Sequence, residues 1–429
     1  MALTIGGGLL LLLTGIGLYA QRQGARDALI VIILIEGALY LACARLVWAG
    51  GFSRRMLVGI LVVAALMRIA VLSAPPSLSS DIYRYVWDGR VQAAGINPYR
   101  YIPVDPHLAA LRDAAIFPNI NRGTYAHTIY PPLAEAMFFA VTRVSERLGW
   151  MKSAMALIEA TGIVLLIRLL LLQAMPPERI LLYAWHPLTV WEFSGSGHLD
   201  AAVVALVALA LWAHARERTA LTGMALGCAA LVKFFPIVVL PALYRRWGWK
   251  LPCAAVATVI LGYLPYLSVG RAVFGFLGGY VSEEGLSGGR GFYLWSLLRQ
   301  AVPSVGTNDL PYIVLAGGVF ASLTLYVGLA HKRSDAETAW AATLAFAFLV
   351  LLSPHYAWYF CWAIPFLCFV PRLSMQYLTV ASPLLYFVRG GPELSGPWLL
   401  VESAMYAPFA VIALLELYQP RLRRIGAQV

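Results

Sequence analysis

Long apolar segments alternate with short polar ones along most of the chain. A helix that crosses a bilayer needs about 20 apolar residues, because in lipid its backbone groups must hydrogen-bond to one another. Such segments lie near residues 2–20, 28–48, 56–74, 152–174, 179–194, 199–214, 219–233, 235–247, 251–268, 311–330, 338–352, 355–370, 376–389 and 397–418. The pattern predicts an all-α polytopic membrane protein with roughly 12–14 transmembrane helices. The two segments that flank residues 233–236 can form one broken helix.

Two longer polar stretches, 75–151 and 269–310, interrupt this pattern. Residues 81–95 have helical spacing. The segment "YPPLAEAMFFAVTRVSERLGW", 130–150, begins with a proline pair suited to a helix N-terminus and then becomes amphipathic, as an interfacial helix would. We therefore expect a single transmembrane domain over residues 1–429. A first outer loop at 75–151 would contain juxtamembrane helices, and a second outer loop would lie at 269–310.

Composition supports membrane insertion. The chain is 60% hydrophobic and 12% charged, whereas soluble domains are about 25% charged. The net charge is 32 − 21 = +11, yet no basic run with interleaved aromatics suggests nucleic-acid binding. With the N-terminus inside, the cations fall on the inner loops, as the positive-inside rule requires. These cations are Arg54, Arg55, Arg216, Arg218, Arg245, Arg246, Lys250, Lys332, Arg333, Arg372, Arg421, Arg423 and Arg424.

Polar residues inside the apolar segments are expected to have structural roles. The five cysteines all lie in apolar segments and have no metal-ligand spacing, so we interpret them as small buried residues. Arg68, Glu36, Arg45 and Arg168 are expected to pair within the bundle, because isolated charges in lipid are costly.

The start of the first outer loop holds the strongest candidates for chemistry. Asp81, Arg84 and Asp88 have spacings of i, i+3 and i+7, which place them on one face of a helix. Arg84 lies between the two carboxylates and can pair with either. One interpretation is a solvated salt-bridge ladder, which contributes little to stability. We favour the other, a carboxylate base at the mouth of a membrane cavity.

The motifs of this loop resemble a known family. "SSDIYRYVWDGRVQAAGINPY" followed by "YPPLAEAMF" is similar to the first outer loop of GT-C membrane glycosyltransferases. The resemblance is closest to polyprenyl-phosphate-mannose-dependent mannosyltransferases. Three further segments resemble the family in order and spacing: "HPLTVWEFSGSGHLD" at 186–200, "LVKFFPIVVLP" at 231–241 and "SPHYAWYFCWAIPF" at 353–366. The resemblance therefore extends over nearly the whole chain.

The resemblance implies an inverting transfer of a hexose, mannose in the closest relatives, from a polyprenyl phosphate to an acceptor hydroxyl. It implies that Asp81 is the catalytic base, with Asp88 as the second candidate. The relatives carry D-x-D at the loop start, whereas Tyr83 replaces the second Asp here. No metal ligand is therefore assigned, and a divalent cation stays an open alternative.

Several residues are candidates for binding the donor. Lys233 can pair with phosphate or extend its ammonium to the interface. Arg290 lies in a Gly-rich loop whose amides can face an anion, or it is a solvated charge. His355 and Tyr356 begin a span and can contact phosphate or sugar, although a lone histidine is more often structural. Arg84 and Tyr130 complete this group.

Glu192, His198 and Asp200 form a second polar cluster. Their spacing across two glycines could hold a divalent cation. Asp200 could equally cap the next helix, where a negative charge suits the helix dipole. We prefer the cap or a substrate contact to a metal site.

Two other classes of function are compatible with this pattern. A transporter or lipid flippase would suit many spans and broken helices, but the polar residues gather at one face and no repeat is visible. A non-catalytic scaffold subunit is the third class. For the enzyme, we expect three partners: a polyprenyl-phosphate sugar, a glycolipid or glycan acceptor, and membrane lipids. The expected location is a bacterial cytoplasmic membrane, with the site on the extracytoplasmic side.

Overall fold

The computed structural model describes residues 1–49, 53–245, 248–283, 291–306, 308, 310–330, 337–370, 372–388 and 396–426. Within these ranges the protein is entirely helical and contains no strand. The α-helices are α1 (Ala2–Arg22), α2 (Arg26–Ala49), α3 (Arg54–Leu72), α4 (Asp81–Ala93), α5 (Pro132–Thr142), α6 (Leu148–Leu172), α7 (Leu181–Ala184), α8 (Pro187–Thr189), α9 (Asp200–Ala215), α10 (Thr219–Ala230), α11 (Leu240–Leu243), α12 (Lys250–Tyr263), α13 (Leu277–Glu283), α14 (Tyr293–Ala301), α15 (Leu310–Ala330), α16 (Glu337–Leu352), α17 (Leu373–Ala381) and α18 (Gly396–Gly426). Tighter or wider helical turns are η1 (Pro106–Leu111), η2 (Phe117–Asn119), η3 (Pro177–Ile180), η4 (Val190–Ser196), η5 (Phe235–Val239), η6 (Leu264–Phe274), η7 (Pro303–Val305), η9 (Ala357–Cys368) and η10 (Ser382–Phe387).

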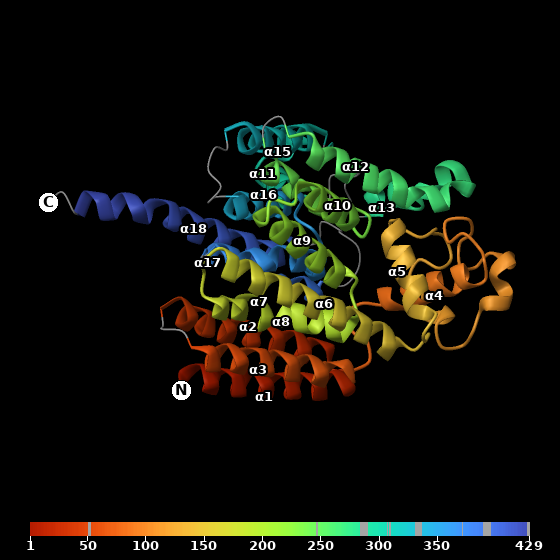
Figure 1. Ribbon diagram of the computed structural model, residues 1–429, viewed down its shortest axis with the longest axis horizontal. Coiled ribbons are helices and arrows are strands. Elements are labelled where there is room, and N and C mark those ends of the chain that lie inside the picture. Colours follow the sequence, from red (N-terminus) through yellow and green to blue (C-terminus); the bar gives the residue numbers. More distant parts are fainter. Residues whose placement is uncertain are drawn as a thin grey trace.

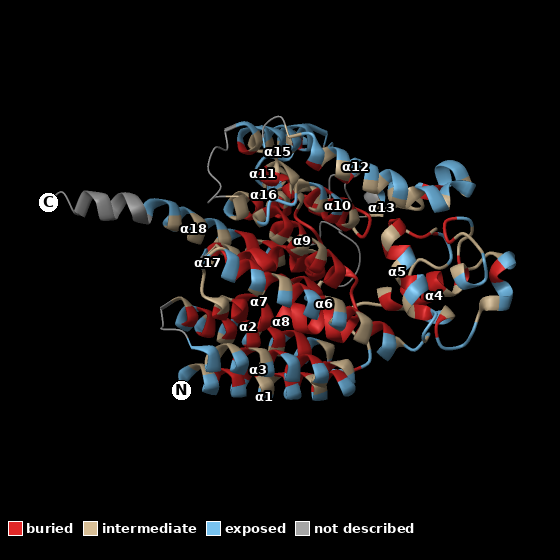
Figure 2. Cartoon of the chain, in the orientation of Figure 1, coloured by how far each residue is buried: buried red, intermediate tan, exposed pale blue. Residues whose placement is uncertain are grey.

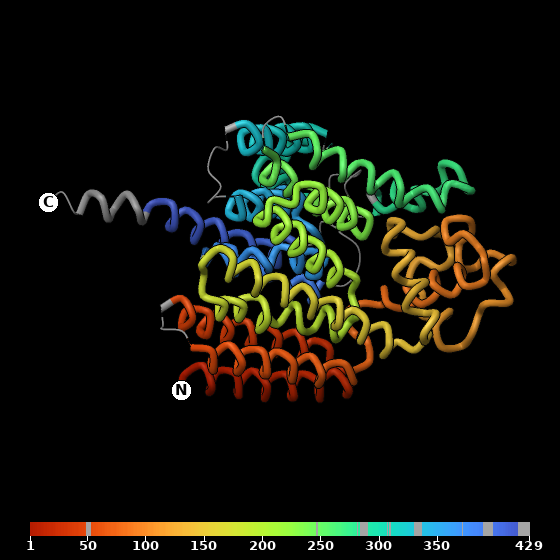
Figure 3. The backbone as a smooth tube through the Cα atoms, viewed as in Figure 1, coloured from red at the N-terminus to blue at the C-terminus, as the bar shows by residue number. Residues whose placement is uncertain are grey.

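The long helices lie side by side along the long axis of the molecule (Figure 1). Helices α1, α2 and α3 form one side of the bundle, α12 and α15 form the opposite side, and α6 to α9 lie between them (Figure 3). Both chain termini lie at one end of the bundle. Helices α4, α5 and α13 lie at the other end, so the segment between α3 and α6 covers that end.

Exposed residues lie on the outer helices, whereas the middle of the bundle is buried (Figure 2). Among the described residues, seven helices are long and apolar enough to cross a membrane: Ala2–Arg22, Arg26–Trp48, Arg54–Leu72, Leu148–Leu172, Lys250–Phe274, Leu310–Leu329 and Trp398–Tyr418. On α15, for example, Val314 and Leu315 are 65% and 66% exposed. Because such contiguous apolar surface is unfavourable in water, the protein is an integral membrane protein.

The other expected spans are shorter or broken. The segment predicted at 179–194 consists of η3, α7, α8 and η4, and the segment at 235–247 consists of η5 and α11. Proline accounts for several of these breaks, because it has no N–H to donate and its ring clashes with the preceding turn. Pro187, Pro236, Pro241, Pro365 and Pro383 each lie in such a segment. Irregular backbone at this depth is tolerated where surrounding protein buries it.

The amphipathic helix predicted at 130–150 is wrong in its extent. Helix α5 ends at Thr142, and α6 begins at Leu148 rather than at residue 152. The Trp150 indole donates to the Val141 carbonyl at 3.1 Å and closes the corner between the two helices. The expected helix at 81–95 is confirmed as α4.

Small residues allow close helix contacts in the bundle. A methyl group added at Gly223 of α10 would meet the carbonyl of Leu251, and one added at Gly227 would meet that of Ala255, both on α12. This G-x-x-x-G spacing brings two backbones together, as it does in other membrane helix pairs.

Two of the four polar residues expected to pair do so. Arg68 donates to both carboxylate oxygens of Glu159 at 2.8 and 2.6 Å. Glu36 accepts from Thr14 at 2.7 Å. Arg45 and Arg168 are exposed on the bundle surface, so the expectation of a buried partner was wrong for them. Among the basic loop residues, Arg246, Lys332 and Arg333 lie outside the described residues.

Candidate active site

Helix α4 is held at the end of the bundle by two glycines. At Gly89, an added methyl group would meet the Phe138 carbonyl and Thr142 of α5. Gly197 has a φ of 77° and lies against Ile82, where a side chain would collide. The first contact packs α4 on α5, and the second brings the turn after η4 against the start of α4. Asp81, the first residue of α4, is thereby placed over the bundle end.

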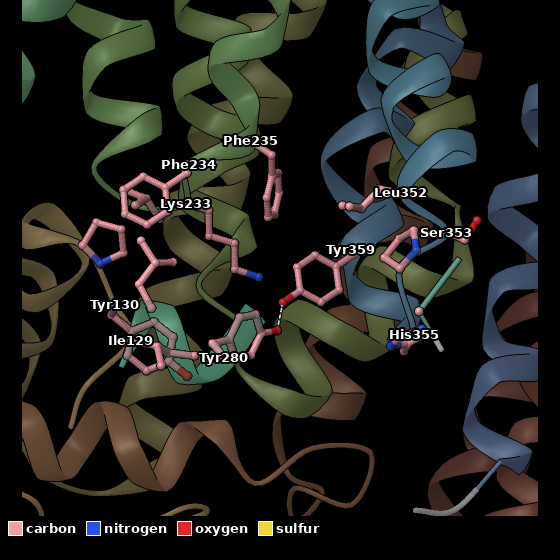
Figure 4. Close-up of a pocket in the computed structure, with 15 residues that line it drawn as sticks. Ile129, Tyr130, Lys233, Phe234, Phe235, Tyr280, Leu352, Ser353, His355 and Tyr359 are labelled. Carbon is pink, nitrogen blue, oxygen red and sulfur yellow. Dashed lines mark hydrogen bonds between the residues drawn. The ribbon is translucent and has the colours of Figure 1, made fainter. Parts of the chain in front are cut away.

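A pocket of about 200 Å³ opens at this end of the bundle (Figure 4). It is lined by Ile129, Tyr130, Pro131, Val232, Lys233, Phe234, Phe235, Leu277, Tyr280, Gly291, Leu352, Ser353, Pro354, His355 and Tyr359. Its walls are mainly aromatic and aliphatic. The Lys233 ammonium lies 4.8 Å from the centroid of the Tyr359 ring. A single ammonium among apolar walls suits an amphipathic ligand with one anionic group.

The Asp81 carboxylate remains partly accessible. Its Oδ1 accepts a hydrogen bond of 2.5 Å from Asn121 Nδ2, and Asp81 is only half-buried. The same carboxylate lies within electrostatic range of Arg122, Tyr130 and His198. Because Tyr130 lines the pocket, an accessible carboxylate within its electrostatic range can accept a proton from a bound hydroxyl.

Asp88, by contrast, is buried between α4 and α5. Arg84 Nε donates to its two oxygens at 2.8 and 2.9 Å, and both side chains are nearly inaccessible, at 4% and 2% exposure. The solvated-ladder interpretation is therefore wrong. Glu135 lies beside Asp88 and accepts from Thr128 at 2.6 Å. Burial and then the Asp88 charge raise the pKa of Glu135 well above its ordinary range.

The structure brings Glu192, His198 and Asp200 together, as the sequence predicted, and adds Lys233 to them. His198 Nε2 lies 3.4 Å from Glu192 Oε2, and its Nδ1 lies 3.9 Å from Asp200 Oδ2. Lys233 Nζ donates to Asp200 Oδ2 at 2.6 Å. Asp200 is the first residue of α9, after the N-cap Leu199, so its negative charge lies in the first turn where it suits the helix dipole.

Within the described residues, three buried atoms of this cluster make no hydrogen bond: Asp200 Oδ1, and Glu192 Oε2 and His198 Nε2, which face each other at 3.4 Å. Buried polar atoms in folded proteins are nearly always satisfied. The cluster therefore has bonding capacity left for substrate hydroxyls or water. Within the described part of the chain, no three metal-ligating side chains converge on one point.

Aromatic rings connect the cluster to the rest of the pocket. Trp358 stacks on His198 at 4.5 Å and on Tyr356 at 4.4 Å. His355 lines the pocket, with its ring edge-on to Trp398 at 5.4 Å. Both residues expected to begin the span after α16 thus lie near the pocket. Arg290, the remaining donor candidate, lies outside the described residues.

Sequence reasoning missed three polar residues near this site. Asn121 contacts Asp81, while Arg122 binds Glu283 of α13 at 2.5 Å. All three lie in irregular or short segments that have no hydrophobic period and match no quoted motif. Only their position inside the two long polar stretches could have drawn attention to them.

The fold and site define a class: an integral membrane protein with an apolar pocket, an accessible carboxylate and a pocket ammonium at one end of its bundle. Residues 9–248, more than half of the chain, match the MptA/B family profile, described as alpha-(1->6)-mannopyranosyltransferase, N-terminal domain. The chain therefore belongs to this family of polyprenyl-phosphate-mannose-dependent GT-C mannosyltransferases. Comparisons with curated proteins and with solved structures gave no significant match.

Family membership makes the chain a glycosyltransferase that takes mannose from a polyprenyl-phosphate donor. The resemblance of the quoted motifs to this family is thus confirmed. Family membership also favours the enzyme over the transporter and scaffold hypotheses.

Proposed function

We propose that the enzyme transfers mannose to a C6 hydroxyl of a glycan or glycolipid acceptor at the extracytoplasmic end of its bundle. Transfer is a single displacement with inversion. The acceptor oxygen attacks C1 of the mannose, the C1–O bond to phosphate breaks, and the phosphate leaves with that electron pair. The observation that carries the proposal is an accessible carboxylate, Asp81, within electrostatic range of Tyr130, which lines the pocket together with Lys233.

Asp81 acts as the general base. Asn121 donates a hydrogen bond to Oδ1 of Asp81. Oδ2 is then the oxygen that takes the proton from the hydroxyl of the acceptor sugar. A carboxylate within hydrogen-bond reach of the attacking hydroxyl is the geometry that such proton transfer requires. Asp88 is fully engaged by Arg84, so the proposal assigns it to holding α4 rather than to proton transfer.

Lys233 stabilises the leaving phosphate. Its ammonium has three N–H donors, and one of them binds Asp200. The side chain is 12% exposed, and a charge in such a shielded site acts more strongly than it would in water. The neighbouring Phe234, Phe235 and Leu277 supply apolar walls for the first isoprene units.

The Glu192, His198 and Asp200 cluster binds hydroxyl groups of the transferred sugar. Among the described residues, the cluster atoms that make no hydrogen bond are two carboxylate oxygens and an imidazole nitrogen. Mannose hydroxyls can both donate to the carboxylates and accept from the imidazole. Tyr356, stacked on Trp358, offers an aromatic face close to these groups.

The direction of insertion follows from charge and topology. The N-terminus lies at the bundle end opposite α4 and α5 (Figure 1). Arg54 and Arg55, at the start of α3, precede a span that leads towards α4. Basic residues favour the cytoplasmic side, so the site faces the extracytoplasmic side.

Purified protein incubated with radiolabelled polyprenyl-phosphate mannose and a mannose-containing glycolipid tests the proposal. Wild type and Asp88→Asn should release lipid phosphate and form product, whereas Asp81→Asn should bind donor without turnover. Near-normal turnover by Asp81→Asn would remove Asp81 as the base. Parallel reactions with EDTA show whether the reaction depends on a divalent cation.

A further inference from the structure

A single turn in the segment between α3 and α6 contacts both the candidate base and the wall of the donor pocket. Asn121 Nδ2 donates to Asp81 Oδ1 at 2.5 Å. The next residue, Arg122, donates from Nε to Glu283 Oε2 at 2.5 Å. Glu283 is the last residue of α13, whose Leu277 and Tyr280 line the pocket. The two side chains thus reach two parts of the site from consecutive backbone positions.

The turn is fixed by several contacts. Arg122 has a φ of 55°, a left-handed conformation that is unfavourable for a residue other than glycine. Such a conformation persists only where the surroundings impose it. Its guanidinium lies 5.5 Å from the Tyr280 ring centroid, and Tyr125 Oη donates to Glu283 Oε1 at 2.7 Å. These contacts leave the Asn121 amide little freedom to turn away from Asp81.

The ion pair between Arg122 and Glu283 is partly buried. The Arg122 side chain is 19% exposed and that of Glu283 is 27% exposed. Burial by itself lowers the pKa of Arg122, but the hydrogen bond and charge of Glu283 outweigh this effect and raise it. The Arg122 guanidinium therefore keeps its charge over the whole range of pH in which an enzyme assay is practical.

We infer that Asn121 is a positioning residue that holds the Asp81 carboxylate in its reactive orientation, and that Arg122 secures this arrangement by binding α13. The inference rests on the proposed role of Asp81 as the base. One amide donor on Oδ1 fixes the plane of the carboxylate and directs Oδ2 towards the acceptor.

The other charged and titratable side chains around Asp81 do not orient its carboxylate. The charged and titratable side chains that face it are Tyr85, Arg122, Tyr130, Glu192 and His198. They come from α4, the turn that contains Arg122, the segment before α5, η4 and the turn after η4. Arg122 itself is bound to Glu283. Among the described residues, the hydrogen bond given to an Asp81 oxygen comes from Asn121.

The test compares Asn121→Ala and the isosteric Asn121→Asp with a matched control, Asn119→Ala. Asn119 lies in the same segment, is exposed, and donates to the Ala115 carbonyl at 3.0 Å. Losing a hydrogen bond to a charged group should lower kcat by about 10- to 100-fold, with little change in KM for the donor. Asn121→Asp should lose at least as much kcat as Asn121→Ala, because its carboxylate has no N–H to donate to the ionised Asp81.

Two outcomes would overturn the inference while leaving the proposed function intact. One is wild-type kcat in both Asn121 variants when Asp81→Asn is inactive. The other is equal loss of kcat in Asn119→Ala, which would make the effect one of loop folding. Donor binding and the thermal unfolding midpoint, measured on each variant, identify any protein that has failed to fold. If Asp81→Asn itself stays active, the proposed base is wrong.

Discussion

The Lys233 ammonium and the Asp200 carboxylate form an ion pair of 2.6 Å that joins the end of α10 to the start of α9. The pair lies at the rim of the pocket, where Lys233 is one of the lining residues. Asp200 keeps one oxygen without a partner. The lysine is therefore held in place by one bond and retains donors for an anion.

Replacing Lys233 with Met should weaken donor binding. The side chain keeps its length and apolar contacts but loses the charge that faces the leaving phosphate. Since a hydrogen bond to a charged group is worth about 1.5–3 kcal/mol, we expect a loss in kcat/KM of about 10- to 100-fold. Asp200→Asn, which keeps the ammonium, should lose less. Equal kcat/KM in Lys233→Met and wild type would contradict a phosphate-binding role.

Removing the charge of Glu283 should loosen α13. In Glu283→Gln the Arg122 guanidinium binds an uncharged amide oxygen instead of a carboxylate. Leu277 and Tyr280 of α13 are therefore held less firmly at the pocket wall. We expect KM for the donor to rise by a factor of about 2–5, because a partly exposed ion pair contributes up to about 1 kcal/mol. Glu146→Gln is the matched control, since Glu146 binds Arg90 at 2.8 Å and is 41% exposed. A similar rise in both variants would show that loss of either carboxylate has the same effect, whether or not it binds α13 to Arg122.

Neutralising Glu135 should change how stability depends on pH. The raised pKa of Glu135 means that the folded protein holds a proton that the unfolded chain releases above the ordinary value of 4.5. Its contribution to stability is full below that value and is lost as pH rises towards the raised one. Glu135→Gln can donate to Asp88 at every pH. The variant should therefore gain stability relative to wild type as the pH rises above 4.5.

Thermal unfolding midpoints in detergent, measured at several pH values, check this prediction. Thr142→Ser, a conservative change on the same helix, should follow the wild-type curve. A constant difference between Glu135→Gln and wild type at all pH values would mean that Glu135 does not exchange a proton on unfolding.

Removing one partner of the buried pair of Arg68 and Glu159 should destabilise the protein more than replacing both partners with apolar residues. Arg68→Met leaves the Glu159 carboxylate without a counter-charge, and removing one partner of a buried pair costs about 3–5 kcal/mol. The double variant Arg68→Met, Glu159→Leu should recover much of this loss because it leaves no unpaired charge. Equal destabilisation in the single and double variants would show that the pair acts through shape rather than charge.

The sequence predicted most elements that have a regular period. Helix α4 was expected at 81–95 and runs from Asp81 to Ala93, because its residues repeat at helical spacing. The long outer spans were found for the same reason. The broken spans were predicted as continuous helices, since a window average of hydropathy does not register single prolines such as Pro187 and Pro383.

Contacts between distant segments were beyond such reasoning. Asn121 and Asp81 are 40 positions apart, and Arg122 and Glu283 are 161 apart. Neither pair has a spacing rule, because both depend on how irregular turns fold over the bundle end. The exposure of Asp81 and the burial of Asp88 were also undecided, since both lie on one face of the same helix.

By itself, the sequence determined that the protein is helical and lies in a membrane, because a chain this apolar must satisfy its backbone bonds internally. Its motifs also indicated the glycosyltransferase family. Only the tertiary structure decided which of two similar carboxylates stays accessible and which residues hold it in place. Those properties depend on burial and on contacts across many residues, which no local pattern of side chains encodes.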